Sequence, residues 1–324
     1  MVIGQWLWAH MHMRSLSRAI RLGSLAAACL MADAAQAAPA RVPGAPTCRE
    51  LERRLDLSRA EATSTQLNLM LFSAADAGCV PLARRLLEAG ASLEARDRFG
   101  AMALARAARS GHVALVELFL ARGAAIDARN LEGATALYAA TENERHATVA
   151  ALLANKADPN LPGAAGVTPI AAAAFKGNGR IVDQLMARGA DPDVMDATGK
   201  AAMTYAAGRG FALIVRRLLG AGVGARRAYG NDLTALMWAA GPEDGVGMRA
   251  AVDVVELLLD AGAPIDATDN RGRTALMIAA ELGHATIVQV LLDRGADRTV
   301  VDKSGKRAAD LAADGSVRDK LLAR

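Results

Sequence analysis

Histidine side chains are the first candidates for acid–base chemistry or metal binding. The chain has five, at His10, His12, His112, His146 and His284. The first two lie in an N-terminal segment of different character, and His146 has no Cys, Asp or Glu at the spacing of a zinc ligand set. His112 and His284 each follow a glycine in similar surroundings. The histidines therefore predict no metal site.

The other reactive residues form no recognisable catalytic motif. There is no Gly-x-Ser-x-Gly elbow, phosphate-binding loop or His-Glu-x-x-His helix. Asp97, Asp196 and Asp269 each precede a glycine by three residues, and turn formation explains them. We therefore predict no catalytic residue, no cofactor and no enzyme activity. An enzyme with an unrecognised site is the weakest hypothesis, because it would need a pocket of carboxylates with perturbed pKa values.

Residues 1–37 have the layout of a secretory signal peptide. Three arginines (14, 18 and 21) precede an apolar run of 11 residues, 22–32, and Ala35-Gln36-Ala37 follows as a small-x-small site. The run is too short to span a bilayer as a helix. We expect cleavage after Ala37, a periplasmic or secreted mature protein, and no stable membrane insertion.

Two other interpretations of this segment stay open. Its arginines and near absence of acidic residues are also found in mitochondrial transit peptides. Lipidation at Cys29 is the second alternative, although the residues before it fit a lipoprotein box poorly. High Ala and Arg with little Lys indicates a GC-rich bacterium as the source.

Two cysteines remain after the predicted cleavage site, Cys48 and Cys79. In an oxidising compartment they could form one disulfide. It would tie a predicted helix over 48–57 to the region that follows. The alternative is that Cys79 is a small buried residue in a turn between helices.

From residue 67 onward the chain repeats itself. A Gly-Ala step follows a helical apolar segment at Gly90, Gly123, Gly189, Gly262 and Gly295, and Lys156 and Gly222 fill the two missing positions. The successive spacings are 33, 33, 33, 33, 40 and 33 residues.

Each landmark of the repeat has a physical role. Alanine pairs such as Ala107-Ala108 and Ala239-Ala240 allow two helices to approach closely. The glycine before Ala supplies the left-handed cap that ends a helix, and a threonine can cap the first helix of each unit. Further glycines, at positions 100, 133, 166, 199, 272 and 305, permit a tight turn between units.

These landmarks together resemble the ankyrin repeat, whose period is 33 residues. Its Thr-Pro-Leu opening of the first helix is similar to the segments starting at Thr135, Thr168, Thr234 and Thr274. Its Gly-His turn is similar to Gly111-His112 and Gly283-His284, and its second helix to residues 116–120 and 255–259. The resemblance implies an all-α ankyrin solenoid of helix-turn-helix units with β-hairpin loops. It also implies that the Gly-His histidines bond the neighbouring repeat.

The predicted signal peptide (1–37) and the resemblance together divide the chain into that segment, a linker and helix (38–66) and a repeat domain (67–324). The expected repeats are about 67–96 (incomplete), 97–129, 130–162, 163–195, 196–228, 229–268, 269–301 and a capping unit 302–324. In the third, Glu144-Arg145 replaces Gly-His and Lys156 replaces the capping glycine, so that helix end should be strained. In the sixth, extra residues within 241–249 predict a glycine-rich mobile loop, either part of the binding side or a neutral insertion.

Composition is consistent with a binding protein and gives no sign of a nucleic-acid partner. The chain of 324 residues is 52% hydrophobic but only 3% aromatic, and its net charge of +4 comes from interspersed charges of both signs. Nucleic-acid binding would require basic residues gathered on one face.

The resemblance implies that hairpin tips and the exposed side of each first helix line a concave surface that binds a partner. The predicted partner-binding residues are Arg98, Phe99, Arg109, Glu142, Phe175, Lys176, Tyr205, Arg209, Trp238, Arg271, Arg273 and Glu281. Arg and aromatic anchors are typical of protein interfaces.

Two alternatives apply to these residues. Tyr205 and Trp238, with Ile278 at the same place in a later unit, could serve only to pack successive first helices. The arginines could instead meet a polyanion, in which case salt would weaken binding steeply.

The first functional hypothesis is a monomeric adaptor of the periplasm or secreted space that binds a protein partner. The second is an exported effector that acts on host proteins. The identity of the partner does not follow from the sequence.

Overall fold

The computed structural model describes residues 47–58 and 62–323. Every described residue belongs to one compact unit, within Pro39–Arg324. The expected signal peptide, residues 1–37, lies outside the described residues.

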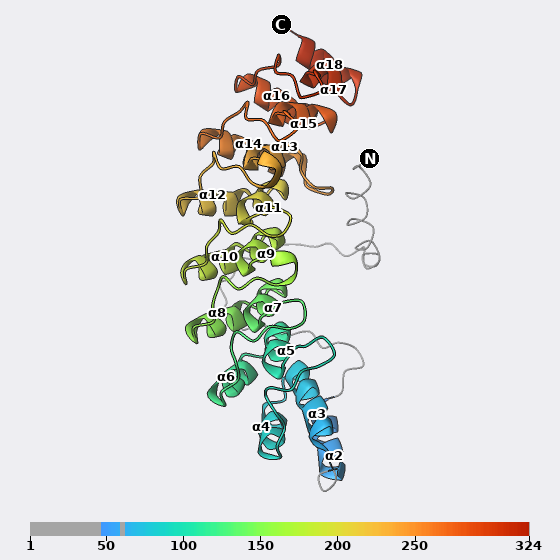
Figure 1. Cartoon of the computed structure of the whole chain (residues 1–324), viewed down its shortest axis with the longest axis vertical. Coiled ribbons are helices and arrows are strands. Elements are labelled where there is room, and N and C mark those ends of the chain that lie inside the picture. Colours follow the sequence, from blue (N-terminus) through green and yellow to red (C-terminus); the bar gives the residue numbers. More distant parts are fainter. Residues whose placement is uncertain (1–46, 59–61, 324) are drawn as a thin grey trace, which may run out of the picture. The chain divides into compact units, whose positions relative to one another are not determined.

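The described residues form short α-helices that follow one another in pairs (Figure 1). An N-terminal helix, α2 (Cys48–Ser58), precedes them. The first helices of the pairs are α3 (Ser64–Ala77), α5 (Ala103–Ser110), α7 (Ala136–Glu142), α9 (Pro169–Lys176), α11 (Ala202–Gly208), α13 (Ala235–Ala240), α15 (Ala275–Glu281) and α17 (Ala308–Leu311). The second helices are α4 (Val80–Glu88), α6 (Val113–Ala121), α8 (His146–Ala154), α10 (Gly179–Met186), α12 (Ala212–Gly220), α14 (Met248–Asp260), α16 (Ala285–Asp293) and α18 (Gly315–Leu322).

The pairs stack in chain order as two layers of helices. From α3 onward each first helix contacts the next first helix, and each second helix contacts the next second helix. We call these the first-helix layer and the second-helix layer; Figure 1 shows both. The all-α repeat architecture predicted from the sequence is therefore confirmed.

Threonine caps begin several of the first helices. The hydroxyl of Thr135 accepts a hydrogen bond from the backbone N–H of Tyr138 at 3.2 Å, and Thr168, Thr234 and Thr274 act in the same way. In α11 the threonine is displaced: Ala201 stands at the cap, and the hydroxyl of Thr204 accepts from the Ala201 N–H at 3.0 Å. A hydroxyl thus satisfies one of the free N–H groups at this helix start too.

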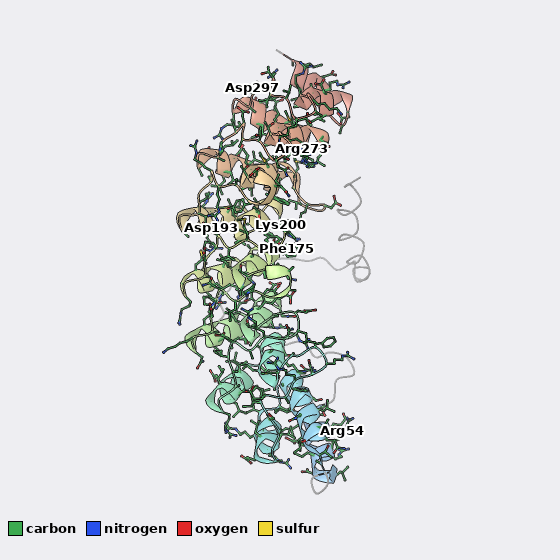
Figure 2. The ribbon with its side chains drawn as sticks, viewed as in Figure 1. Arg54, Phe175, Asp193, Lys200, Arg273 and Asp297 are labelled. Carbon is green, nitrogen blue, oxygen red and sulfur yellow. A yellow bond between two sulfur atoms is a disulfide. The ribbon has the colours of Figure 1, made fainter. Side chains whose placement is uncertain are left out.

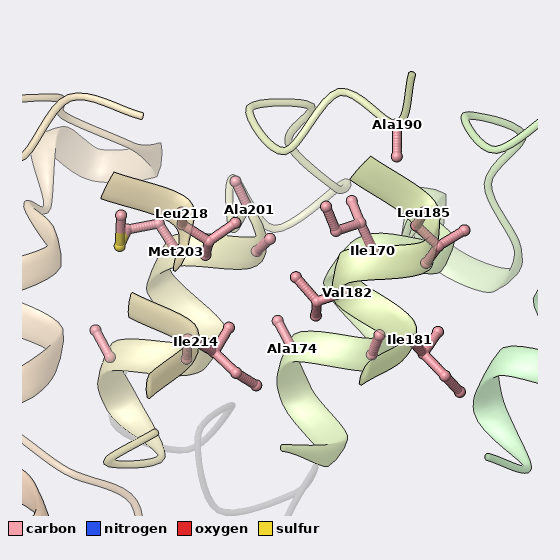
Figure 3. Close-up of a cluster of buried hydrophobic side chains, with 14 of the residues drawn as sticks. Ile170, Ala174, Ile181, Val182, Leu185, Ala190, Ala201, Met203, Ile214 and Leu218 are labelled. Carbon is pink, nitrogen blue, oxygen red and sulfur yellow. The ribbon is translucent and has the colours of Figure 1, made fainter. Parts of the chain in front are cut away.

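A continuous apolar core lies between the two layers (Figure 3). Alanines of the first helices, such as Ala174, are fully buried against branched residues of the second helices, such as Ile181 and Leu185. Alanine allows the short helices to approach closely. The branched residues supply most of the buried apolar area, which is the main stabilising contribution.

Short hairpin turns join the pairs, and five of them are built on one acceptor side chain. Asp196 Oδ1 accepts from the N–H groups of Thr198 and Lys200, and Asp97, Asn130, Asp269 and Asp302 repeat the pattern. The turn glycines have positive φ, for example 78° at Gly199. The described residues contain no strand, only one isolated antiparallel bridge between Ala228 and Thr234. Two further hairpins have Gly163 and Tyr229 at the acceptor position, and their tips form the 3₁₀ turns η1 (Ala164–Gly166) and η2 (Gly230–Asp232).

The first repeat begins at Ser64, three residues before the predicted start at 67. A capping box causes this difference: Thr63 accepts from the Gln66 N–H, and the Gln66 side chain accepts from the Thr63 N–H. Helix α2 packs on α3 and α4 through the buried Leu51 and Leu55.

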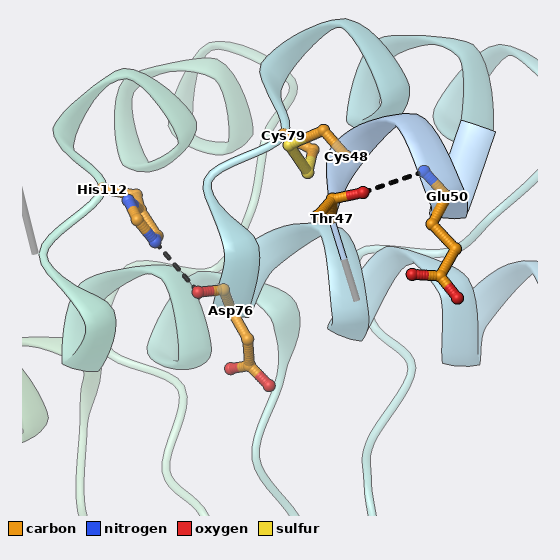
Figure 4. The surroundings of a disulfide bond; sticks show 6 residues. All are labelled: Thr47, Cys48, Glu50, Asp76, Cys79 and His112. Carbon is orange, nitrogen blue, oxygen red and sulfur yellow. Dashed lines mark hydrogen bonds between the residues drawn. A yellow bond between two sulfur atoms is a disulfide. The ribbon is translucent and has the colours of Figure 1, made fainter. Parts of the chain in front are cut away.

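A disulfide between Cys48 and Cys79 joins the start of α2 to the turn between α3 and α4 (Figure 4). Cys79 is also buried, so both sequence interpretations of that residue apply together. Nearby, the His112 ring bonds the backbone oxygen of Asp76 at 2.9 Å, and His284 bonds that of Ala240 at 3.0 Å. Both histidines thus bond the preceding repeat, as expected.

The third repeat shows the predicted strain. Glu144 and Lys156, which replace glycines, have φ values of 58° and 67°. This left-handed conformation costs a non-glycine residue roughly 1–2 kcal/mol.

None of the helices in the described ranges combines the length and the apolar character needed to cross a membrane.

Candidate functional site

Three aromatic residues from successive repeats lie near one another on the first-helix layer. Phe175 lies in the last turn of α9, Tyr205 lies in α11 and Trp238 lies in α13, and the Lys200 ammonium is close to the rings of both Tyr205 and Trp238. The Phe175 and Tyr205 rings meet edge to face, with centroids 5.7 Å apart. All three are half-buried. We call them the aromatic cluster; Figure 2 labels Phe175.

Small residues occupy positions next to or equivalent to these rings. Gly208 ends α11, and a Cβ added there would come within 3.6 Å of the Trp238 ring. In α9, the position equivalent to Tyr205 and Trp238 is occupied by Ala172. The rings therefore lie at the surface of the layer, partly open to solvent, and are not enclosed by larger side chains.

Two cations flank the aromatic cluster. The guanidinium of Arg209, directly after α11, lies 4.4 Å from the Phe175 ring centroid and 5.7 Å from that of Phe211. The Lys200 ammonium lies 4.7 Å from the Trp238 centroid and 5.4 Å from that of Tyr205. Cations at these distances are attracted to aromatic faces.

Asp196 connects its hairpin to the aromatic cluster. Its Oδ2 accepts a hydrogen bond from the Tyr205 hydroxyl, at 2.5 Å, while Oδ1 holds the hairpin. Burial alone would raise the pKa of the Asp196 carboxyl, but the hydroxyls of Thr198 and Tyr205 and the nearby backbone N–H groups together lower it. Burial and the bond to Asp196 raise the pKa of Tyr205, so its phenol stays protonated and donates.

This arrangement makes the stability of the site depend on pH. A carboxyl whose pKa is lowered in the folded state stabilises the fold above its ordinary pKa of about 4. The stabilisation is lost as pH falls through the lowered value. We expect the urea midpoint of the wild type to fall more, between about pH 7 and pH 3, than that of Asp196→Asn. Asparagine keeps the acceptor oxygen, as Asn130 does in its hairpin, but does not titrate.

Asp196→Ala serves as the control for this prediction. It removes the acceptor at every pH and should cost about 1–3 kcal/mol even at neutral pH. Equal acid sensitivity of the wild type and Asp196→Asn would contradict the role given to the carboxylate.

The insertion of the sixth repeat folds back onto the same region. It forms a loop over 241–247, while Met248 and Arg249 already belong to α14, so the loop is shorter than the predicted 241–249. The Glu243 N–H donates to the Gly208 oxygen at 2.9 Å, and its carboxylate pairs with Arg209 at 3.2 Å. A hollow of about 330 Å³, lined by Arg209, Phe211 and the loop residues Asp244 to Gly247, opens beside it.

The structure places the other predicted residues apart from the aromatic cluster. Arg98 and Phe99 are exposed at the hairpin tip before α5, where the Arg98 guanidinium lies 4.7 Å from the Phe99 centroid. Phe99 is 56% exposed, and the adjacent tip presents Leu131, 79% exposed, whose N–H donates to the Phe99 oxygen. Arg109 lies in the last turn of α5, 3.5 Å from Asp76.

Charged residues near the C-terminal end of the stack form ion pairs with one another. Arg273, only 14% exposed, pairs with Asp269 and with Glu281. Arg271 is exposed at the hairpin tip, 3.7 Å from Asp269. The structure therefore gives Arg273 and Glu281 a place in an internal ion-pair network. Glu142 and Lys176 are exposed at the ends of α7 and α9, and Ile278 is buried, as the packing interpretation predicts.

The sequence did not single out three residues that complete the site. Lys200, Phe211 and Glu243 are not among the predicted partner-binding residues. A signal for Glu243 was present, since an acidic residue stands in the only insertion of the repeat array. Within the described ranges, no group of three or more His, Cys, Asp or Glu residues could hold a metal ion.

Comparison with known proteins identifies the architecture. The family model "Ankyrin repeats (3 copies)" matches residues 71–162 and 170–248, and "Ankyrin repeats (many copies)" matches 251–312. The human ASB11 ankyrin repeat domain is similar at 27% identity and a TM-score of 0.60, covering 68% of this chain and 96% of that one. The ankyrin repeat domain of Bcl-3 is similar in fold at 23% identity and a TM-score of 0.59, covering 69% and 99%. No curated protein matches the sequence. The period, the caps and these matches together show that the chain belongs to the ankyrin repeat family.

Proposed function

We propose that the chain binds a protein partner through the aromatic cluster and its flanking cations. Ankyrin repeats indicate a scaffold for protein–protein interaction. The observation that carries the specific proposal is the placement of Phe175, Tyr205 and Trp238 on one layer, with Lys200 and Arg209 against their rings.

The chemistry of this surface suits a protein interface. A few Trp, Tyr and Arg residues usually contribute most of the binding energy, and they cluster near the centre of the contact. Here the rings are already held by neighbouring helices and by the Tyr205–Asp196 hydrogen bond. Little side-chain freedom would be lost when a partner covers them, which favours binding.

Internal pairing of the arginines argues against a polyanion as the partner. Arg209 pairs with Glu243, and Arg273 pairs with Asp269 and Glu281. These guanidinium groups therefore present little uncompensated charge to phosphates. We expect a shallow dependence of binding on salt, whereas several phosphate contacts would give a steep one.

The test compares two double variants in a pull-down from envelope and secreted extracts. Phe175→Ala/Trp238→Ala removes two anchors, each expected to contribute about 2 kcal/mol or more. The dissociation constant of the captured partner should rise by at least about 30-fold, the effect of losing one anchor, and by roughly 1,000-fold where the two losses add. Phe99→Ala/Leu131→Ala removes exposed apolar side chains of the hairpin tips and should change the constant little. Circular dichroism checks that both variants keep the fold.

The control variant also supplies the contradicting outcome. Partner loss on changing Phe99 and Leu131, with normal recovery after changing Phe175 and Trp238, would move the interface to the hairpin tips. Equal recovery of the partner with both double variants would contradict binding through the first-helix layer.

We further propose that the mature protein works as a monomer in an oxidising compartment, the periplasm or secreted space. The features that support export are the signal-like segment 1–37 and the Cys48–Cys79 disulfide. Fractionation of the source cells, combined with alkylation of free thiols before unfolding, tests this. Protein in the cytosolic fraction, with both thiols alkylated, would contradict it.

A further inference from the structure

We infer that the partner presents a carboxylate side chain to Lys200, next to an apolar group that covers the rings of Tyr205 and Trp238. This inference deepens the proposed function and rests on it. It names the chemistry of the bound segment: an aspartate or glutamate flanked by an apolar residue.

The Lys200 ammonium carries a charge that the chain does not neutralise. Within the described ranges no Asp or Glu oxygen lies within ion-pair distance of it, whereas Arg209 and Arg273 each have such a partner. The acidic residue closest to Lys200 in sequence, Asp196, already accepts hydrogen bonds at both of its carboxylate oxygens. Its oxygens accept from the backbone N–H groups of Thr198 and Lys200 and from the hydroxyls of Thr198 and Tyr205.

The surroundings of this ammonium determine what can cover it. It lies against the Trp238 and Tyr205 rings and is partly buried, so a bound segment would remove much of its remaining water. Covering a cation with apolar groups alone is costly unless a counter-charge accompanies them. A carboxylate supplies that charge together with a charge-assisted hydrogen bond.

The charge is also isolated along the stack. In the hairpins on either side, the position equivalent to Lys200 is occupied by Val167 and Leu233. One ammonium between two apolar positions fits one carboxylate in an otherwise apolar segment. It does not fit a run of acidic residues or phosphates, which would need a row of cations.

The test uses a display library of short random peptides selected on the full-length chain. Selection on the wild type should enrich sequences with Asp or Glu at one fixed position beside an apolar or aromatic residue. Selection on Lys200→Met should lose that acidic preference and keep the apolar one, since methionine preserves the aliphatic contact. Lys303→Met, which changes an exposed lysine in the hairpin before α17, is the matched control and should enrich the same acidic sequences as the wild type.

Synthetic versions of the enriched peptide make the test quantitative. Replacing its Glu by Gln, or Lys200 by Met, should weaken binding about 10- to 100-fold, the range typical of a hydrogen bond between charged groups. The two changes together should cost little more than either alone. A Glu→Lys peptide should regain affinity for Lys200→Glu.

Three outcomes would overturn the inference, and they separate it from the proposed function. Peptides whose binding depends on Phe175 and Trp238 but not on Lys200 would support the proposed interface and contradict the carboxylate contact with Lys200. Peptides that bind equally well after all of these changes would overturn both. No enrichment at all would also overturn both.

Discussion

Gly199→Ala is expected to destabilise the protein by about 2–4 kcal/mol, from two separate causes. Gly199 has φ of 78°, which disfavours any residue with a Cβ. In addition, an added Cβ would lie only 2.5 Å from the Cα of Gly230 in the next hairpin. That neighbour is backbone, and the Gly230 N–H donates to the Gly199 oxygen at 2.8 Å, so the hairpins cannot separate without losing this bond. Urea unfolding followed by circular dichroism measures the loss.

Gly189→Ala is the matched control for this variant. Gly189 has a similar φ of 82°, but an added Cβ would meet nothing within 4 Å. This substitution should therefore show the conformational cost alone, roughly 1–2 kcal/mol. Equal losses in the two variants would show that contact between neighbouring hairpins does not limit the packing of the repeats. Because Lys200 follows Gly199, the first variant should also weaken partner binding.

Removal of the disulfide is expected to have the second large effect. Cys48→Ala/Cys79→Ala should lower the free energy of unfolding by about 2–4 kcal/mol, because the crosslink restricts the unfolded chain. The bond closes a segment with a sequence separation of 31 residues. Since α2 is held otherwise mainly by the packing of residues such as Leu51 and Leu55, its amides should also exchange faster. Thermal unfolding and hydrogen exchange measure the two effects.

Reduction of the wild type provides the control for the disulfide prediction. A reductant should lower the stability of the wild type to that of the double variant and leave the variant unchanged. Unchanged exchange of the α2 amides in the variant would mean that packing alone fixes this helix on the first repeat.

Much of the fold follows from local sequence rules. The 33-residue period, the threonine caps and the glycines at positive φ each act within one repeat, so the sequence alone predicts them. The same holds for Lys156, whose left-handed conformation follows from its place in the period. The start of the first repeat was harder to predict from the sequence. Its capping box, Thr63 to Gln66, lies where the repeat pattern is incomplete.

The candidate site was only partly predictable, because its key contacts join different repeats. Arg209 and Glu243 are 34 residues apart, and their pairing depends on how the insertion folds back on Gly208. The contact of Lys200 with the Trp238 ring depends on the stacking of two successive units. Arg273 matched the expected binding position, yet its side chain turns to Asp269 and Glu281. Side-chain direction at an exposed position is set by such neighbours, which a repeat pattern does not specify.

The central claim, that the first-helix layer around the aromatic cluster binds a protein, is tested most directly by photo-crosslinking in the source organism. A photoreactive phenylalanine derivative is placed at Lys176, beside Phe175, or at Arg216, an exposed residue of α12 in the second-helix layer. The account predicts a specific crosslinked protein from position 176, absent from position 216 and reduced by Trp238→Ala. A crosslink formed only from position 216, or one from position 176 that Trp238→Ala leaves unchanged, would contradict it.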